Sequence, residues 1–176
     1  MIEIIKNSIA RIIVKWNLRR QSSVNISFIN AFSNAVNVLI MLPADEEDFR
    51  QSFVLLSALD YNAKNIHLLT YDFRVSMLPY NLRGKAVEHG IIDVNRLDLP
   101  KHKFIEKLKY KNINATLDLN RKENLFYSYT AQLLDVKLRM GFVKKDSDKY
   151  YNFQVRNHEK NPEKSYNNFL NCLKMF

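Results

Sequence analysis

The chain has 176 residues, 47% of them hydrophobic, and a formal net charge of +9. That length suits one globular domain that buries a core without a disulfide or a metal staple. The single Cys172 leaves no partner for an internal disulfide and fits a reducing, cytoplasmic compartment. No run of about 18 apolar residues occurs, so no membrane-spanning helix is expected. Beyond residue 23 both signs of charge are mixed, without a zinc-finger, RRM or KH signature, so nucleic acid is not an expected partner.

The first segment of the chain is basic and has helical periodicity. Residues 1–23 contain five cations and one acid, namely Lys6, Arg11, Lys15, Arg19, Arg20 and Glu3. Apolar residues recur at three- and four-residue intervals, at Ile2, Ile5, Ile9, Ile12, Ile13 and Trp16. This spacing predicts an amphipathic helix from residue 2 to about residue 21. Residues 1–23 could lie on an anionic membrane surface, or the helix could pack on its own domain or on a partner subunit.

A polar connector follows, so residues 1–34 are predicted to form a basic helix and connector that precede a single domain over residues 35–176. "AVNVLIML" at 35–42 is nearly continuously apolar, as in a strand buried on both faces. The segment 44–65 begins with acids and continues with helical spacing. "NIHLLTY" at 65–71 and "GIIDV" at 90–94 are the second and third predicted strands, and 100–112 is a predicted helix.

The alternation continues to the end of the sequence. "INATLDL" at 113–119 and "KLRMGFV" at 137–143 are predicted strands around a helix at 122–135, and "YNFQV" at 151–155 is a further short strand. Gly141 inside a strand indicates a bulge or a close backbone approach. Asn161 and Pro162 predict the start of a final helix over 161–176, which places Cys172 in the core. Strands that alternate with helices predict a doubly wound, mostly parallel, Rossmann-like α/β domain.

Ligands of such sheets bind beyond the carboxyl ends of the strands. The turn after the fourth predicted strand is the most suggestive place, because it offers Asp118, Asn120, Arg121 and Lys122. These side chains could bind a sugar hydroxyl or a phosphate before a helix N-terminus, or they could serve only as turn and cap residues. The three glycines form neither G-x-G-x-x-G nor a Walker A loop, and the four histidines are scattered. No cofactor and no metal are therefore expected.

The second half of the sequence resembles a known family. "INATLDLN", "NLFYSYTAQLLDVKLRMGF", "YYNFQV" and "NPEKSYNNFLNCLKMF" follow the order found in the amino-terminal domain of family 9 glycosyltransferases, the heptosyltransferase group. The resemblance also extends to short, uncharacterised bacterial domains. It implies that Asp45, in "LPADEED", is the candidate catalytic acid, although the glycine that precedes that acid in the family is missing. A carboxy-terminal domain for the nucleotide-sugar donor does not fit within this length.

The resemblance implies a stand-alone, non-catalytic domain with a binding or accessory role in bacterial envelope glycan biosynthesis of the lipopolysaccharide type. The protein would be cytoplasmic and associated with the membrane through residues 1–23. The alternative is a subunit of a split or oligomeric glycosyltransferase that completes its site with a second chain or as a homodimer. In that case Asp45 or Asp118 would take part in sugar transfer from a nucleotide-sugar donor.

Overall fold

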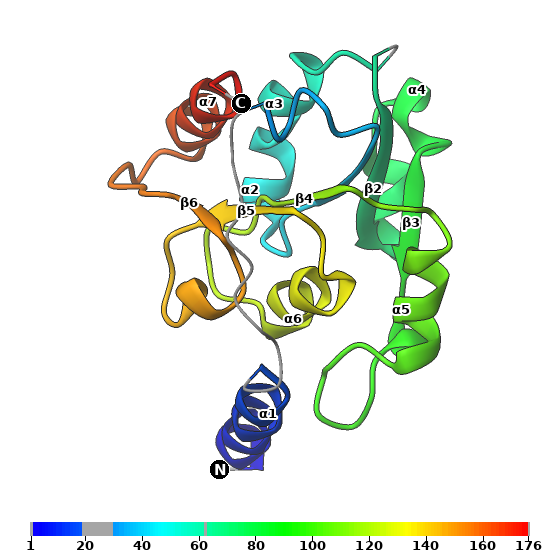
Figure 1. Ribbon diagram of the computed structural model, residues 1–176, viewed down its shortest axis with the longest axis vertical. Helices are drawn as coiled ribbons and strands as arrows, with labels where there is room; N and C mark the ends of the chain where they lie inside the picture. Colours follow the sequence, from blue (N-terminus) through cyan, green and yellow to red (C-terminus); the bar gives the residue numbers. More distant parts are fainter. Residues whose placement is uncertain (1, 19–29, 62, 176) are drawn as a thin grey trace.

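The computed structural model describes residues 2–18, 30–61 and 63–175. These residues form one six-stranded sheet in the order β3-β2-β1-β4-β5-β6, and every neighbouring pair of strands is parallel (Figure 1). The strands are β1 (Asn37–Met41), β2 (Asn65–Tyr71), β3 (Ala86–His89), β4 (Ala115–Asp118), β5 (Leu138–Phe142) and β6 (Phe153–Val155). The strand order reverses between β1 and β4, which makes this junction the topological switch point of a doubly wound sheet. The predicted Rossmann-like α/β fold is confirmed.

Helices cover both faces of the sheet. They are α1 (Ile2–Leu18), α2 (Glu46–Gln51), α3 (Phe53–Ser57), α4 (Tyr80–Arg83), α5 (His102–Lys109), α6 (Leu125–Leu134) and α7 (Pro162–Leu173), with 3-10 turns η1 (Asp72–Met77), η2 (Ile91–Asp93) and η3 (Ser147–Lys149). One core layer contains side chains of α2, α3 and α7, and the other contains side chains of α1, α5 and α6. Figure 1 shows α3 and α7 on the opposite side of the sheet from α1 and α6.

Strand β1 explains why the sheet needs two helical layers. Its side chains point alternately to the two faces, so Val38 and Ile40 belong to one core and Leu39 and Met41 to the other. All four are fully buried. The prediction of a strand buried on both faces is therefore confirmed, and this strand lies at the centre of the domain.

Gly141 lies in β5 and pairs regularly with both neighbouring strands, so of the two predicted alternatives the structure shows a close approach and not a bulge. A Cβ at this position would lie 3.1 Å from ring carbons of Tyr151. Tyr151 is itself buried. Its ring occupies the space that a side chain larger than that of glycine would need at position 141. The glycine thus leaves room on β5 for the aromatic side chain of Tyr151, which comes from the segment after the strand.

The predicted strand at 90–94 is wrong, because the third strand is β3, which ends at His89. Ile91 and Ile92 lie instead in η2 and are 91% and 82% exposed. β3 pairs only with β2, at the edge of the sheet, and it buries Val87 and His89 while Ala86 is half-buried and Glu88 is exposed. A half-exposed edge strand has a weaker apolar signal than the isoleucine pair that follows it.

Other boundaries differ in smaller ways. The helix predicted within 44–65 is two short helices that meet at Ser52, whose hydroxyl donates to the Phe49 carbonyl at 2.7 Å. Such a side-chain bond competes with the helical backbone pattern. Cys172 is half-buried against the α7 side of the core. Of the predicted connector, residues 21–29 lie outside the described part of the chain.

Candidate functional site

The turn predicted as a binding site lies at the switch point of the sheet. Asp118 is the last residue of β4, and its backbone is in register with Met41 of β1 and Gly141 of β5. The turn that follows leads into α6, whose N-cap Asn124 accepts a hydrogen bond from the Tyr127 amide at 3.4 Å. The sequence-predicted residues Asp45, Asp118, Asn120, Arg121 and Lys122 are brought together here, although each has its own partners.

The Asp118 carboxylate is fully buried and surrounded by donors. Lys144 Nζ lies 2.8 Å from Oδ2, and the Tyr151 hydroxyl donates to the same oxygen. The other oxygen accepts from the Asn120 amide at 2.9 Å and from Asn120 Nδ2 at 2.7 Å. A carboxylate that is removed from water is tolerated when such donors satisfy its oxygens. Asp118 therefore belongs to the interior of the protein, where these donors occupy both carboxylate oxygens.

Asn120 connects the two turns at the switch point. Its side-chain oxygen accepts from the Ala44 amide at 2.8 Å, and its Nδ2 also lies 3.4 Å from the Leu42 carbonyl. Because the side chain is 3% exposed, these bonds satisfy polar groups that water does not reach. The amide thus joins the end of β4 to the chain that leaves β1.

Arg121 makes a partly buried ion pair with Asp48 of α2, at 3.0 Å. Its second terminal nitrogen donates to the Lys160 carbonyl at 2.9 Å, so the guanidinium joins α2 to the loop before α7. Burial raises the pKa of Asp48, and the charge of Arg121 opposes that shift. Arg121 Nε has no partner among the described residues. The side chain thus connects three segments of the scaffold.

Asp45 and Lys122 are the accessible part of the turn. Asp45 caps α2 through the Asp48 amide at 3.2 Å, and its other oxygen accepts from Lys122 Nζ at 2.6 Å. The hydrogen bond from Lys122 lowers the pKa of Asp45, so this carboxyl is ionised and not suited to donate a proton. The hollow beside them has a volume of about 250 Å³, which is below the usual size of a small-molecule site.

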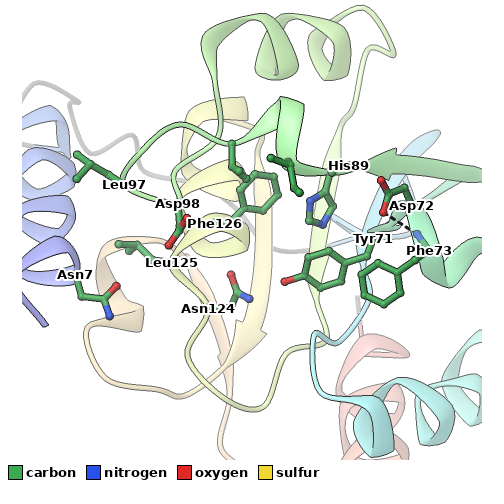
Figure 2. A pocket seen from close by; sticks show the side chains of 13 residues that line it. Asn7, Tyr71, Asp72, Phe73, His89, Leu97, Asp98, Asn124, Leu125 and Phe126 are labelled. Atoms are coloured by element: carbon green, nitrogen blue, oxygen red, sulfur yellow. Dashed lines mark hydrogen bonds between the residues drawn. The ribbon is translucent and has the colours of Figure 1, made fainter. Parts of the chain in front are cut away.

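A larger cavity lies at the carboxyl ends of β2 and β3, and sequence reasoning did not identify it. Its volume is about 580 Å³, within the range of small-molecule sites. Figure 2 shows side chains from both strand ends, from the start of α6 and from α1 around it. The lining residues that matter most are Tyr71, Asp72, Phe73, His89, Asn124 and Phe126. The available signal was the sequence "TYDF", which places two aromatic residues and an acid directly after a buried strand.

His89 is the buried polar group of this cavity. Its Nε2 lies 2.8 Å from the Tyr127 hydroxyl, and its ring stacks on Phe126 with a centroid distance of 4.4 Å. Burial lowers the pKa of His89 to about 4, against the opposing charges of Asp93 and Asp72. The imidazole is therefore neutral near pH 7. Its Nδ1 has no hydrogen-bond partner among the described residues.

No family model, curated protein or solved structure matches this chain. The resemblance to family 9 glycosyltransferases therefore stays a prediction, and the chemistry must be argued from the residues. Among the described residues that line the larger cavity, none is Ser, Thr, Cys or Lys, and the titratable ones are Tyr71, Asp72, His89 and Asp98. Within the described ranges, no three His, Cys, Asp or Glu side chains are grouped for a metal ion. The cavity has the volume of a small-molecule site.

Proposed function

We propose that this chain is a non-catalytic, glycosyltransferase-like module with an accessory role in bacterial envelope glycan biosynthesis, and that it docks to the membrane through α1. The observation that carries the membrane docking is the direction of the apolar stripe of α1, whereas the glycosyltransferase-like role rests on the resemblance of the sequence. None of the described helices is long and apolar enough to cross a membrane, so the docking is to the surface.

Helix α1 packs on the domain through a face other than its apolar stripe. Ala10 and Val14 are fully buried in the core layer that contains α5 and α6. Asn17 donates to the Tyr129 hydroxyl at 2.7 Å. The stripe faces away from these contacts, and its exposed members are Ile5, Ile9, Ile12, Ile13 and Trp16. Because one helix turn is about 3.6 residues, these side chains form a single outward surface.

The charges of α1 have two different uses. Lys6 pairs with Asp98 at 2.5 Å, and Arg11 pairs with Glu123 at 2.7 Å, so both cations fasten the helix to the domain. Lys15 is exposed, and the sequence continues with Arg19 and Arg20, which lie outside the described residues. A helix with isoleucine and tryptophan on one face and cations at its side suits the interface of an anionic bilayer.

The non-catalytic part of the proposal is supported by the state of the candidate acids. Asp118 is enclosed by Lys144, Tyr151 and Asn120, and Asp45 is engaged by Lys122 and by its cap bond. A general base or nucleophile needs a free oxygen directed at substrate. An assay for sugar transfer or donor hydrolysis with nucleotide-sugars tests this part, and turnover above the protein-free blank would favour the split-enzyme alternative.

Flotation on vesicles tests the docking. The full chain should float with vesicles of phosphatidylglycerol and phosphatidylcholine, and the double variant Ile12→Ser, Trp16→Ser should stay at the bottom of the gradient. The control is Tyr80→Ser, Tyr110→Ser, which removes two side chains outside α1 that are even more exposed, 88% and 86% against 60% for Ile12 and 67% for Trp16. Equal flotation of the two variants would overturn the membrane proposal. If nothing floats but the chain dimerises through α1, a second subunit is the partner instead.

A further inference from the structure

A small hollow lies between α1 and the turn η3. Its volume is about 260 Å³, and the described residues that line it are Arg11, Ile12, Lys15, Asp146, Lys149 and Tyr150. Three of these six side chains are cations, two from α1 and one from η3. The hollow is below the usual size of a small-molecule site, so it suits a single charged group of a larger ligand.

The hollow adjoins the outward apolar stripe of α1. Ile12 belongs to that stripe, is 60% exposed, and also lines the hollow. Lys15 follows Ile12 by three residues and Trp16 follows it by four, so the three side chains are neighbours on the helix surface. Lys15 also follows Arg11 by four residues, and it therefore lies between Arg11 and the stripe. The hollow thus opens at the edge of the surface that faces away from the domain.

The ion pairs of the hollow leave one of its cations unpaired. Asp146 is the single acid that lines it, and this side chain pairs with Lys149 and lies 3.5 Å from Arg11. Arg11 also pairs at 2.7 Å with Glu123, which does not line the hollow. Lys15 is exposed and has no ion-pair partner in the described part of the chain. Three cations therefore face two acids even when Glu123 is counted, and the unpaired ammonium is the one beside the stripe.

Tyr150 lines the same hollow and is 5% exposed. Burial raises the pKa of Tyr150 to about 12, and the charge of Arg11 opposes that rise. The hydroxyl is therefore protonated near neutral pH, and it donates no hydrogen bond to another described residue. A phenolic proton without an acceptor favours a ligand that carries acceptor oxygens.

We infer that the hollow between α1 and η3 binds the phosphate group of an anionic phospholipid, whose acyl chains contact Ile12 and Trp16. An interfacial helix lies at the boundary between acyl chains and headgroups, so cations at the edge of its apolar stripe reach the level of the phosphates. Lys15 contacts the phosphate from α1 and Lys149 contacts it from η3, where Asp146 competes with it. The inference rests on the membrane docking proposed above, and it adds η3 as a second contact that fixes the orientation of the domain.

Flotation of the full chain at several concentrations of phosphatidylglycerol and phosphatidylcholine vesicles gives a partition coefficient. Lys15→Ala, Lys149→Ala should lower this coefficient about tenfold or more, because each cation near an anionic surface contributes about fivefold. The charge-matched control is Lys164→Ala, Lys174→Ala, which removes two exposed lysines of α7 and its C-cap, on the opposite side of the sheet (Figure 1). This control should lower the coefficient by less than about threefold. Equal losses in the two double variants would overturn the inference.

Two acids of the same turn separate binding in the hollow from general attraction to the membrane. Asp146→Asn removes the acid that competes with the phosphate, and Asp148→Asn removes an exposed acid that does not line the hollow. Both substitutions raise the net charge by one. Asp146→Asn should raise the partition coefficient by about threefold to fivefold, and Asp148→Asn by less than about twofold. Equal gains would mean that the hollow has no special role. Thermal unfolding verifies that the variants are folded.

A short-chain lipid tests the hollow without a membrane. Dihexanoyl phosphatidylglycerol, kept below its micelle concentration, should cause saturable shifts of the amide resonances of residues 11–15 and 146–150. Inorganic phosphate should need about a tenfold higher concentration or more, because it lacks the chains that contact the stripe. An equal response to phosphate, or no shifts in these two segments, would contradict a lipid site.

The two measurements distinguish failure of the docking from failure of the hollow. Absence of flotation together with binding of the short-chain lipid would overturn the docking and retain the hollow. Flotation that is equal for the two double lysine variants, without shifts in the two segments, would retain the docking and overturn the hollow.

Discussion

Lys144 Nζ lies 2.8 Å from Asp118 Oδ2, and the two side chains are 4% and 0% exposed. Lys144 comes from the loop after β5 and also donates to the Asn120 carbonyl at 2.8 Å. The charge at the switch point of the sheet is therefore neutralised from within the chain. This pair is the main reason to regard the turn after β4 as part of the scaffold.

Removal of either partner of this pair should destabilise the fold. Lys144→Met leaves a buried carboxylate without its counter-charge, and Asp118→Asn leaves a buried ammonium, so each should lower the free energy of unfolding by about 3–5 kcal/mol. The double variant should lose less free energy of unfolding than the two single variants together, and the difference should be about 1–3 kcal/mol. Urea unfolding of the four proteins measures this coupling, and strict additivity would contradict a direct pair.

Arg121 and Lys122 are neighbours with different expected effects. Arg121→Ala removes the partner of Asp48 and the bond to the Lys160 carbonyl, so it should cost about 2 kcal/mol of unfolding free energy. Lys122→Ala removes only an exposed pair with Asp45, and its urea midpoint should match that of the unaltered chain. Equal midpoints for the two variants would show that Arg121 does not connect the segments as described.

Gly141→Ala should destabilise the domain because the added Cβ meets the Tyr151 ring at 3.1 Å. The expected cost is about 1–3 kcal/mol, typical of overpacking in a core. Gly84→Ala is the matched control, because a Cβ there meets no atom within 4 Å and the backbone has an ordinary helical φ of −66°. Thermal unfolding compares the two variants. A neutral Gly141→Ala would mean that Tyr151 can move without loss.

Acid should weaken the fold through His89. Its pKa is about 4 in the folded protein, below the ordinary value of 6.5, so between these pH values the unfolded chain binds a proton that the folded chain does not. The free energy of unfolding therefore falls as pH decreases from about 7 to 4, by on the order of 3 kcal/mol from this residue.

The variant His89→Gln isolates that contribution, since other groups also titrate in this range. Its unfolding free energy should change less between pH 7 and pH 4.5 than that of the unaltered chain. His158→Gln, at an exposed position, serves as the control and should keep the full pH dependence. An identical pH profile for His89→Gln and the unaltered chain would contradict the buried, neutral imidazole.

Periodicity was sufficient to predict most of the fold. Buried parallel strands such as β1 have continuous apolar runs, and Asn161 with Pro162 marks the start of α7, where the Asn161 side chain accepts from the Lys164 amide at 3.2 Å. The third strand could not be placed, because η2 contains two exposed isoleucines and the edge strand before it is short and half-exposed. Local apolar content does not distinguish a short edge strand from a 3-10 turn that contains exposed isoleucines.

The position of the candidate site could be predicted from the sequence, but the burial and the hydrogen-bond partners of its residues could not. The sequence places Asp118 at a strand end, yet its partners Lys144 and Tyr151 are 26 and 33 residues away along the chain, in a loop whose lysines suggest solvent exposure. Likewise, the stripe of α1 follows from spacing, but the face that packs on the domain does not. That face uses the smaller Ala10 and Val14, which are buried in the same core layer as side chains of α5 and α6.

Trp16 tests the docking of α1 most directly, because it is the single tryptophan of the chain and is 67% exposed in the outward stripe. Its fluorescence reports on this surface without a label. Titration of the full chain with vesicles of phosphatidylglycerol and phosphatidylcholine should shift the emission maximum to shorter wavelength, and pure phosphatidylcholine should do so less. An emission maximum that stays unchanged at millimolar anionic lipid would contradict membrane docking through α1.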